Sequence, residues 1–320
     1  MQPFTLLPVY KDYLWGGVRL KEDWNAGAPL ERIAESWTLA AHPAGDNRIA
    51  GGPCEGMTLS GAARAHPGIV SPRHRAEDPF PVMVKLIDAR LPLSVQVHPD
   101  DVQAAQSGGL GKTEMWYILD HAPGAFLYLG PGSSLSRGEL ERAIAEGTLT
   151  ERLRKVEVHR GGCFFIPAGT LHSIGGGILL AEVQQSSDLT YRVFDYGRLG
   201  PDGKPRELHI ERALEAARLE PADPTPPGAS PEVPVAGGRL RTLAACPQFR
   251  AELLHLSGRW EREDAGTFHS LLCLEGRATL RTASASLAAL KGASLFVPAC
   301  AGPFWLEGEG QLLIVSTIYD

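Results

Sequence analysis

The sequence has few cysteines and no long apolar run, and both absences narrow the class of protein. Its five cysteines among 320 residues are odd in number and widely scattered, at positions 54, 163, 246, 273 and 300. This pattern favours buried free thiols in a reducing compartment over a disulfide framework. No apolar run approaches the roughly 20 residues that a membrane-spanning helix needs. The N-terminal residues show no basic stretch followed by an apolar core, so we expect no signal peptide. The sequence therefore predicts a cytoplasmic protein.

An excess of positive charge is also absent. The 31 lysines and arginines are outnumbered by 37 aspartates and glutamates, which gives a net charge of −6. The sequence has no run of lysines and arginines of the kind that binds nucleic acid. The hydrophobic fraction of 43% and the charged fraction of 21% are those of a globular protein, and the length suits one large domain or two ordinary ones. We expect neither a nucleic-acid partner nor a membrane partner.

Short strand patterns separated by glycine and proline turns dominate the chain. Helical spacing is found at residues 57–66, 136–158 and 207–219 and in a short turn at 100–106. The stretch 136–158 reads as an inserted pair of short helices. Residues 221–238 are prolines, glycines and small residues without periodicity, which is typical of a linker. The sequence therefore predicts a first domain at 1–220, a linker at 221–238 and a second, smaller β domain at 239–320.

One stretch of the first domain collects polar residues that are unusual in strands. Gln96 and His98 stand two residues apart, as do Lys112 and Glu114, so each pair faces one side of its strand. His172 follows a Pro-Ala-Gly turn later in the chain. Buried charge requires a partner or a metal. Two imidazoles, a carboxylate and an amide suit zinc or a neighbouring divalent metal, with a coordination position left for substrate.

An internal repeat relates the two domains. Residues 161–183 parallel residues 291–315, and the strand at 114–119 parallels the strand at 269–274. In this alignment His269 replaces Glu114, Pro303 replaces His172, and the Gln-x-His pair has no counterpart. The second domain is therefore predicted to be a repeat of the first domain and to hold no metal.

Four motifs carry a resemblance to a known family: SVQVHPDD (94–101), GKTEMWYIL (111–119), PAGTLHSIG (167–175) and SSDLTYRVFD (186–195). Together with YxxxLWGG at 10–17 and AESW at 34–37, they resemble the short bacterial form of type I mannose-6-phosphate isomerase, of the cupin superfamily. The resemblance implies a mainly β fold of tandem cupin (jelly-roll) barrels. It also implies one zinc ion per chain, bound by Gln96, His98, Glu114 and His172. The implied reaction interconverts mannose 6-phosphate and fructose 6-phosphate through an enediol.

Three further residues are candidates for catalysis and substrate binding. Lys112 shares a strand face with Glu114, and a nearby cation and desolvation both favour a neutral lysine that can act as a general base. Lys112 is also a plausible phosphate contact. Arg192 matches the arginine that the family places at its active site, and its planar fork suits phosphate. Glu182 matches an active-site glutamate of the family, either as an acid/base partner or as an ion-pair mate of Arg192.

The adjacent Asp100 and Asp101 stand at the start of a short helical pattern, so we expect them to cap a helix and not to act as acids or bases.

Two alternatives belong to other functional classes. The chain could be a different cupin metalloenzyme that acts on a sugar phosphate, or an iron oxygenase, but a glutamine ligand is uncharacteristic of the latter. It could also be a non-enzymatic sugar-binding cupin. The complete ligand set, together with Lys112 and Arg192, argues against that alternative for the first domain.

Overall fold

The computed structural model describes residues 1–24, 28–106, 108–200, 203–263 and 266–318, which form two compact units. Each unit is assembled from segments that are distant in the sequence. Unit 1 comprises Met1–Val9, Ser36–Lys85 and Pro226–Asp320, and unit 2 comprises Tyr10–Glu35 and Leu86–Thr225. This grouping differs from the expected division at 221–238, because N-terminal segments join the C-terminal strands. In unit 1, for example, Phe4 pairs with Phe296 in an antiparallel ladder.

Unit 2 is a β structure with a few short helices. Its elements are η1 (Leu20–Trp24), β8 (Val95–Val97), α2 (Asp101–Ala105), β9 (Glu114–His121), β10 (Phe126–Pro131), α3 (Arg137–Ala145), α4 (Leu149–Arg152), β11 (Leu153–Glu157), β12 (Cys163–Ile166), β13 (His172–Ile174), β14 (Ile178–Gln185), β15 (Tyr191–Phe194) and α5 (Ile210–Ala216). One of its sheets has the order β11-β10-β13-β8-β15. A second sheet has the order β12-β9-β14-β7-β3-β2, in which β7 is Val82–Ala89, β3 is Glu35–Leu39 and β2 is Val9–Lys11.

The core of unit 2 follows from strand periodicity. Trp116 and Ile118 on β9 lie on one face and are almost completely buried, in a cluster with Leu127 and Leu129 of β10. Burying each such side chain contributes about 1.5–3 kcal/mol. Glu114 continues the same face of β9 by one further step of two residues and is fully buried. The polar site therefore begins where the apolar face of β9 ends.

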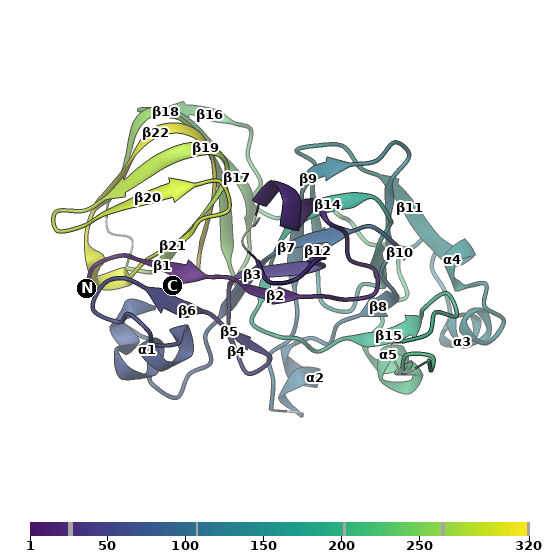
Figure 1. The fold of residues 1–320 in the computed structure, drawn as a ribbon. Helices are drawn as coiled ribbons and strands as arrows, with labels where there is room; N and C mark the ends of the chain where they lie inside the picture. Colours follow the sequence, from purple (N-terminus) through teal and green to yellow (C-terminus); the bar gives the residue numbers. More distant parts are fainter. Residues whose placement is uncertain (25–27, 107, 201–202, 264–265, 319–320) are drawn as a thin grey trace. The chain divides into compact units, whose positions relative to one another are not determined.

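Unit 1 contains the second β domain and the N-terminal strands. Its elements are β1 (Phe4–Leu7), β4 (Ala41–His42), β5 (Gly45–Asp46), β6 (Arg48–Ala50), α1 (Leu59–Ala65), η2 (Pro67–Ile69), β16 (Val233–Val235), β17 (Gly238–Ala245), β18 (Arg250–Arg262), β19 (His269–Arg281), β20 (Ser286–Leu290), β21 (Ser294–Val297), η3 (Ala299–Ala301) and β22 (Phe304–Ser316). The long strands β18, β19 and β22 curve around a common core in Figure 1. Within that unit, the buried carboxylate of Glu252 accepts hydrogen bonds from Arg250 and Arg262 at 3.1 and 2.7 Å.

Most predicted elements are present, and two boundaries differ. The expected helix at 57–66 is α1, which Thr58 caps by accepting from Gly61 N. The helical prediction for 136–158 was wrong at its C-terminal end, because residues 153–157 form strand β11. Part of the expected linker, Val233–Val235, forms strand β16 against β17. Among the described residues, no helix is both long and apolar enough to cross a membrane.

Candidate active site

Three neighbouring strands of unit 2 align the first set of candidate side chains. His172 at the start of β13 pairs with Gln96 of β8, and Gln96 in turn pairs with Arg192 of β15. Directly opposed residues of an antiparallel sheet project from the same face. The fold therefore brings residues that are 76 and 96 positions apart in the sequence (172 minus 96, and 192 minus 96) into one row.

His98, Glu114 and His172 form a compact cluster of potential metal ligands. Their donor atoms lie within 4.8 Å of one another, and all three side chains are buried. His98 Nε2 lies 3.6 Å from Glu114 Oε2, and His172 Nε2 lies 3.4 Å from Glu114 Oε1. Tetrahedral zinc with bonds of about 2.0–2.2 Å separates its ligand atoms by roughly 3.4 Å. The observed separations therefore fit a single ion of that size.

The fourth candidate ligand, Gln96, lies against the same cluster. Its amide nitrogen is 3.3 Å from His172 Nε2, and its amide oxygen accepts from Ser94 Oγ at 3.3 Å. The two ends of an amide are assigned from hydrogen bonding, and a serine hydroxyl can both donate and accept. Rotation of the amide by 180° would therefore turn its oxygen toward the cluster and preserve the contact with Ser94.

Both imidazoles are oriented by backbone carbonyls. Nδ1 of His98 donates to Leu189 O at 2.8 Å, and Nδ1 of His172 donates to Thr170 O at 2.8 Å. Each bond fixes the tautomer and leaves the Nε2 lone pair directed at Glu114, which is the usual support for a metal-binding histidine. Burial lowers the pKa of His172 to about 4, so this imidazole stays neutral at physiological pH. His172 is therefore in the neutral form that a metal-binding imidazole requires.

Lys112 contributes a positive charge to this cluster. Its Nζ lies 3.0 Å from Glu114 Oε2 and 3.1 Å from His98 Nε2, and its side chain is buried. A buried carboxylate is costly unless a cation or hydrogen-bond donors compensate it. Lys112 supplies such a cation for Glu114 through this ion pair.

Glu182 is connected to the ligand cluster by the side chain of Trp116. It lies opposite Trp116 on the neighbouring strand, and its Oε2 accepts from Trp116 Nε1 at 2.9 Å. The Trp116 ring meets the His172 ring edge-on, with 5.5 Å between centroids. Glu182 is 3% exposed. The structure therefore places this carboxylate one aromatic ring away from the ligand cluster.

Arg192 lies at the edge of the site among further arginines. Its Nη1 donates to Glu207 O at 2.8 Å, and its Nε is buried with no hydrogen-bond partner among the described residues. Burial and the charge of Arg206 lower the pKa of Arg192. Asp195 binds both Arg206 and Arg198. The three arginines outnumber the two carboxylates, those of Asp195 and Glu207, so this edge keeps a net positive charge, which suits an anionic group.

Some residues near the site were not found from the sequence. Gln184 lies opposite Glu114 and is fully buried; its amide nitrogen donates to Gln185 O and Ser187 O, at 2.7 Å each. Its Oε1 has no hydrogen-bond partner among the residues that the structure describes. The QQ dipeptide at 184–185, in an otherwise apolar strand, was the available signal.

The two aspartates at the start of α2 have different contacts. Asp100 caps this helix in a reciprocal capping box with Gln103, as predicted. Asp101 does more than begin the helix, because its Oδ1 accepts from Gly111 N and from Gln185 Nε2.

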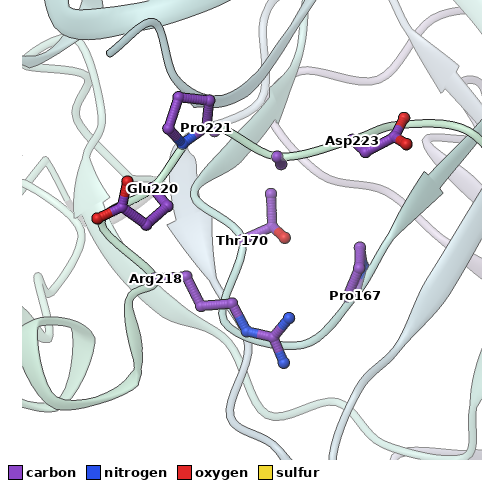
Figure 2. A pocket seen from close by; sticks show the side chains of 8 residues that line it. Pro167, Thr170, Arg218, Glu220, Pro221 and Asp223 are labelled. Atoms are coloured by element: carbon purple, nitrogen blue, oxygen red, sulfur yellow. The ribbon is translucent and has the colours of Figure 1, made fainter. Parts of the chain in front are cut away.

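A separate cavity of about 330 Å³ is lined by the turn that precedes His172. Figure 2 shows the Arg218 side chain running toward Pro167, with Pro221 and Asp223 on the other side of Thr170. Thr170 is also the residue whose carbonyl accepts from His172. None of the candidate catalytic or ligand residues lines this cavity, so we do not assign it to the active site.

The fold and the ligand cluster define a cupin with a site that could bind a divalent metal. Two family models match the chain: the catalytic domain of type I phosphomannose isomerase over residues 4–125, and the cupin domain of mannose-6-phosphate isomerase over residues 240–318. Mannose-6-phosphate isomerase ManA from Bacillus subtilis (strain 168) is 35% identical over 315 residues, which cover 98% of both chains. The chain belongs to the type I phosphomannose isomerase family, whose members are aldose–ketose isomerases.

Solved structures agree with this assignment. The crystal structure of mannose 6-phosphate isomerase from Bacillus subtilis has a TM-score of 0.91 at 33% identity and covers 99% of this chain and 100% of its own. A zinc-bound mannose 6-phosphate isomerase has a TM-score of 0.76 at 18% identity, with full coverage of both chains. At that identity, the second comparison supports the fold alone.

Proposed function

We propose that this chain is a zinc-dependent isomerase that interconverts mannose 6-phosphate and fructose 6-phosphate through an enediol intermediate. The observation that carries the proposal is the buried cluster of His98, Glu114 and His172 in a member of this family. Family membership supports the substrate. The ligand types support zinc, and a structural neighbour is named as zinc-bound.

We propose Gln96, His98, Glu114 and His172 as the ligands of one zinc ion per chain. When bound, zinc supplies a Lewis acid and a template for the substrate oxygens. Two neutral imidazoles, a neutral amide and one carboxylate would leave the site with a formal charge near +1. Such a site favours an anionic substrate and an enediolate, whereas three carboxylates would not.

The remaining candidate residues have proposed roles in proton transfer or in substrate binding. Lys112 is the proposed general base that moves the proton between C1 and C2, because its amino group lies against His98 and Glu114. Arg192 is the proposed phosphate ligand, because it lies at a positively charged edge. Glu182, held by Trp116, is the second candidate for proton transfer.

We further propose that the C-terminal β domain of residues 239–320 holds no metal and that the catalytic site lies among residues 1–220. The proposed location is the cytoplasm, and the proposed partner is a small sugar phosphate, with neither nucleic acid nor membrane involved.

A metal assay combined with a coupled isomerase assay tests the function. Purified protein should contain one zinc per chain and convert mannose 6-phosphate to fructose 6-phosphate. Metal without this activity would favour another cupin metalloenzyme. Neither metal nor activity would favour a sugar-binding cupin.

A further inference from the structure

The three residues that lead into β9 are held by contacts outside any strand ladder. Gly111, Lys112 and Thr113 precede the first residue of this strand. Their backbone N–H groups nevertheless all donate: Gly111 N to Asp101 Oδ1 at 2.8 Å, Lys112 N to Pro99 O at 3.0 Å, and Thr113 N to Gln185 Oε1 at 2.9 Å. Two of the three acceptors are thus side-chain oxygens, those of Asp101 and Gln185.

Asp101 and Gln185 form one connected support. Gln185 Nε2 donates to Asp101 Oδ1 at 2.9 Å, and Gln185 N donates to Thr113 O at 3.1 Å. Gln185 is 6% exposed and uses both ends of its amide. A Cβ at Gly111 would lie 2.6 Å from Asp101 N, so only glycine permits the two backbones to approach this closely.

The hydrogen bonds of Asp101 and Gln185 fix the backbone from which the amino group of Lys112 extends. Lysine is among the side chains with the largest conformational entropy, about 1.5–2 kcal/mol, so its placement depends on a fixed backbone. Displacing a reacting group by about 1 Å can cost up to roughly 100-fold in rate. We propose that Asp101 and Gln185 are positioning residues, which hold residues 111–113 so that Lys112 Nζ stays against His98 and Glu114. This inference rests on the proposed function.

Alanine and asparagine at position 101 test the proposal. Asp101→Ala removes the acceptor of two hydrogen bonds, whereas Asp101→Asn retains an acceptor oxygen of the same shape. Asp101→Ala should lower kcat with mannose 6-phosphate by about 10- to 100-fold while KM changes less than about threefold. Asp101→Asn should recover most of that loss, and Gln185→Leu should resemble Asp101→Ala.

Asp100→Ala is the matched control. It removes the cap of α2, in which Asp100 Oδ1 accepts from Gln103 N at 2.9 Å, but leaves the contacts of Asp101 in place. The control should lose stability without losing kcat. Equal losses of kcat in both alanine variants would overturn the proposal, because a general effect of helix α2 would then explain the result. A parental kcat in Asp101→Ala would overturn it directly.

Amide hydrogen exchange gives a readout that does not depend on activity. Residues 111–113 should exchange faster in Asp101→Ala than in the parent and the Asp100→Ala control. Unchanged exchange would overturn the proposed support even if kcat fell. A parent protein that fails to isomerise mannose 6-phosphate, with faster exchange in Asp101→Ala, would instead refute the proposed function and leave the structural support standing.

Discussion

Lys112→Met should strengthen metal binding while it weakens catalysis. The substitution leaves an unbranched side chain that is one atom shorter, and it removes the positive charge. Nζ lies 3.0 Å from Glu114 Oε2 and 3.1 Å from His98 Nε2, the same atoms that the ligand cluster offers to a metal. A divalent ion shared by those atoms would come within roughly 4 Å of the ammonium group. The two positive charges then oppose each other.

The size of this effect follows from Coulomb's law. Two unit charges 4 Å apart interact by about 1 kcal/mol in bulk water, so a divalent ion and an ammonium group repel by about 2 kcal/mol. Burial of Lys112 weakens the screening, whereas loss of its proton, which a general base requires, would limit the repulsion, so we keep this value. Since about 1.4 kcal/mol corresponds to a factor of ten, Lys112→Met should bind zinc about 30-fold more tightly.

Competition titration of the metal-free protein with a chromophoric chelator measures this affinity. Lys155→Met is the control for a change in net charge, because Lys155 lies over the Phe126 ring on the exposed strand β11. An unchanged or weaker affinity in Lys112→Met would refute the reasoning, because it would show that no positive charge of Lys112 reaches the ligand cluster.

Steady-state kinetics of the same variant test the role of Lys112 in proton transfer. We expect kcat to fall by about 100-fold or more with little change in KM. If only KM rises, Lys112 is a phosphate contact, and Glu182 becomes the first candidate for the base.

Four further predictions concern the ligand set, the phosphate site, the second β domain and pH. His172→Ala should lower metal affinity and abolish activity in a protein that remains folded by circular dichroism; full metal content would remove His172 from the ligands. Arg192→Ala should mainly raise KM for the sugar phosphate and weaken inhibition by inorganic phosphate, and a fall in kcat alone would contradict this role. Elemental analysis should find one metal per chain, and two would contradict a metal-free second domain. Burial raises the pKa of Glu252, but Arg262 and Arg250 outweigh this effect and lower the pKa below its usual value. The ion pair therefore stabilises the fold at neutral pH, and this contribution is lost as the pH falls below about 4.3. In urea at pH 7, the free energy of unfolding of Glu252→Gln should be about 2 kcal/mol lower than that of the parent, and the difference should shrink in acid; a difference that does not change with pH would contradict the argument.

The candidate site could be predicted from the sequence because its residues lie in short motifs with a recognisable spacing. The two-residue spacings of Gln96 with His98 and of Lys112 with Glu114 fix shared strand faces without any knowledge of the fold. His172 could be added because its turn and strand resemble a known motif. The structure places all of these side chains together, in the row from β13 to β8 and in the cluster around Glu114.

The contacts that support the site could not be predicted, because they join backbone groups to side chains that are distant in sequence. Nothing in the local pattern shows that Gln185 reaches Thr113 and Asp101. Strand β11 was missed for another reason. It is mostly exposed and rich in charge, and such a short segment fits helical spacing as well as strand alternation.

The pairing of β1 with β21 has a consequence for how the chain is synthesised and folds. Phe4 and Phe296 are separated by 292 positions, so a very long loop must close before this ladder can form. All residues of unit 2 have been synthesised by Thr225, whereas unit 1 requires strands that follow this residue in the chain. β1 can pair early with β6, but its other edge has no partner strand until residues 294–297 have been synthesised. A nascent chain that stops short of residue 294 therefore exposes one edge of β1 to other chains.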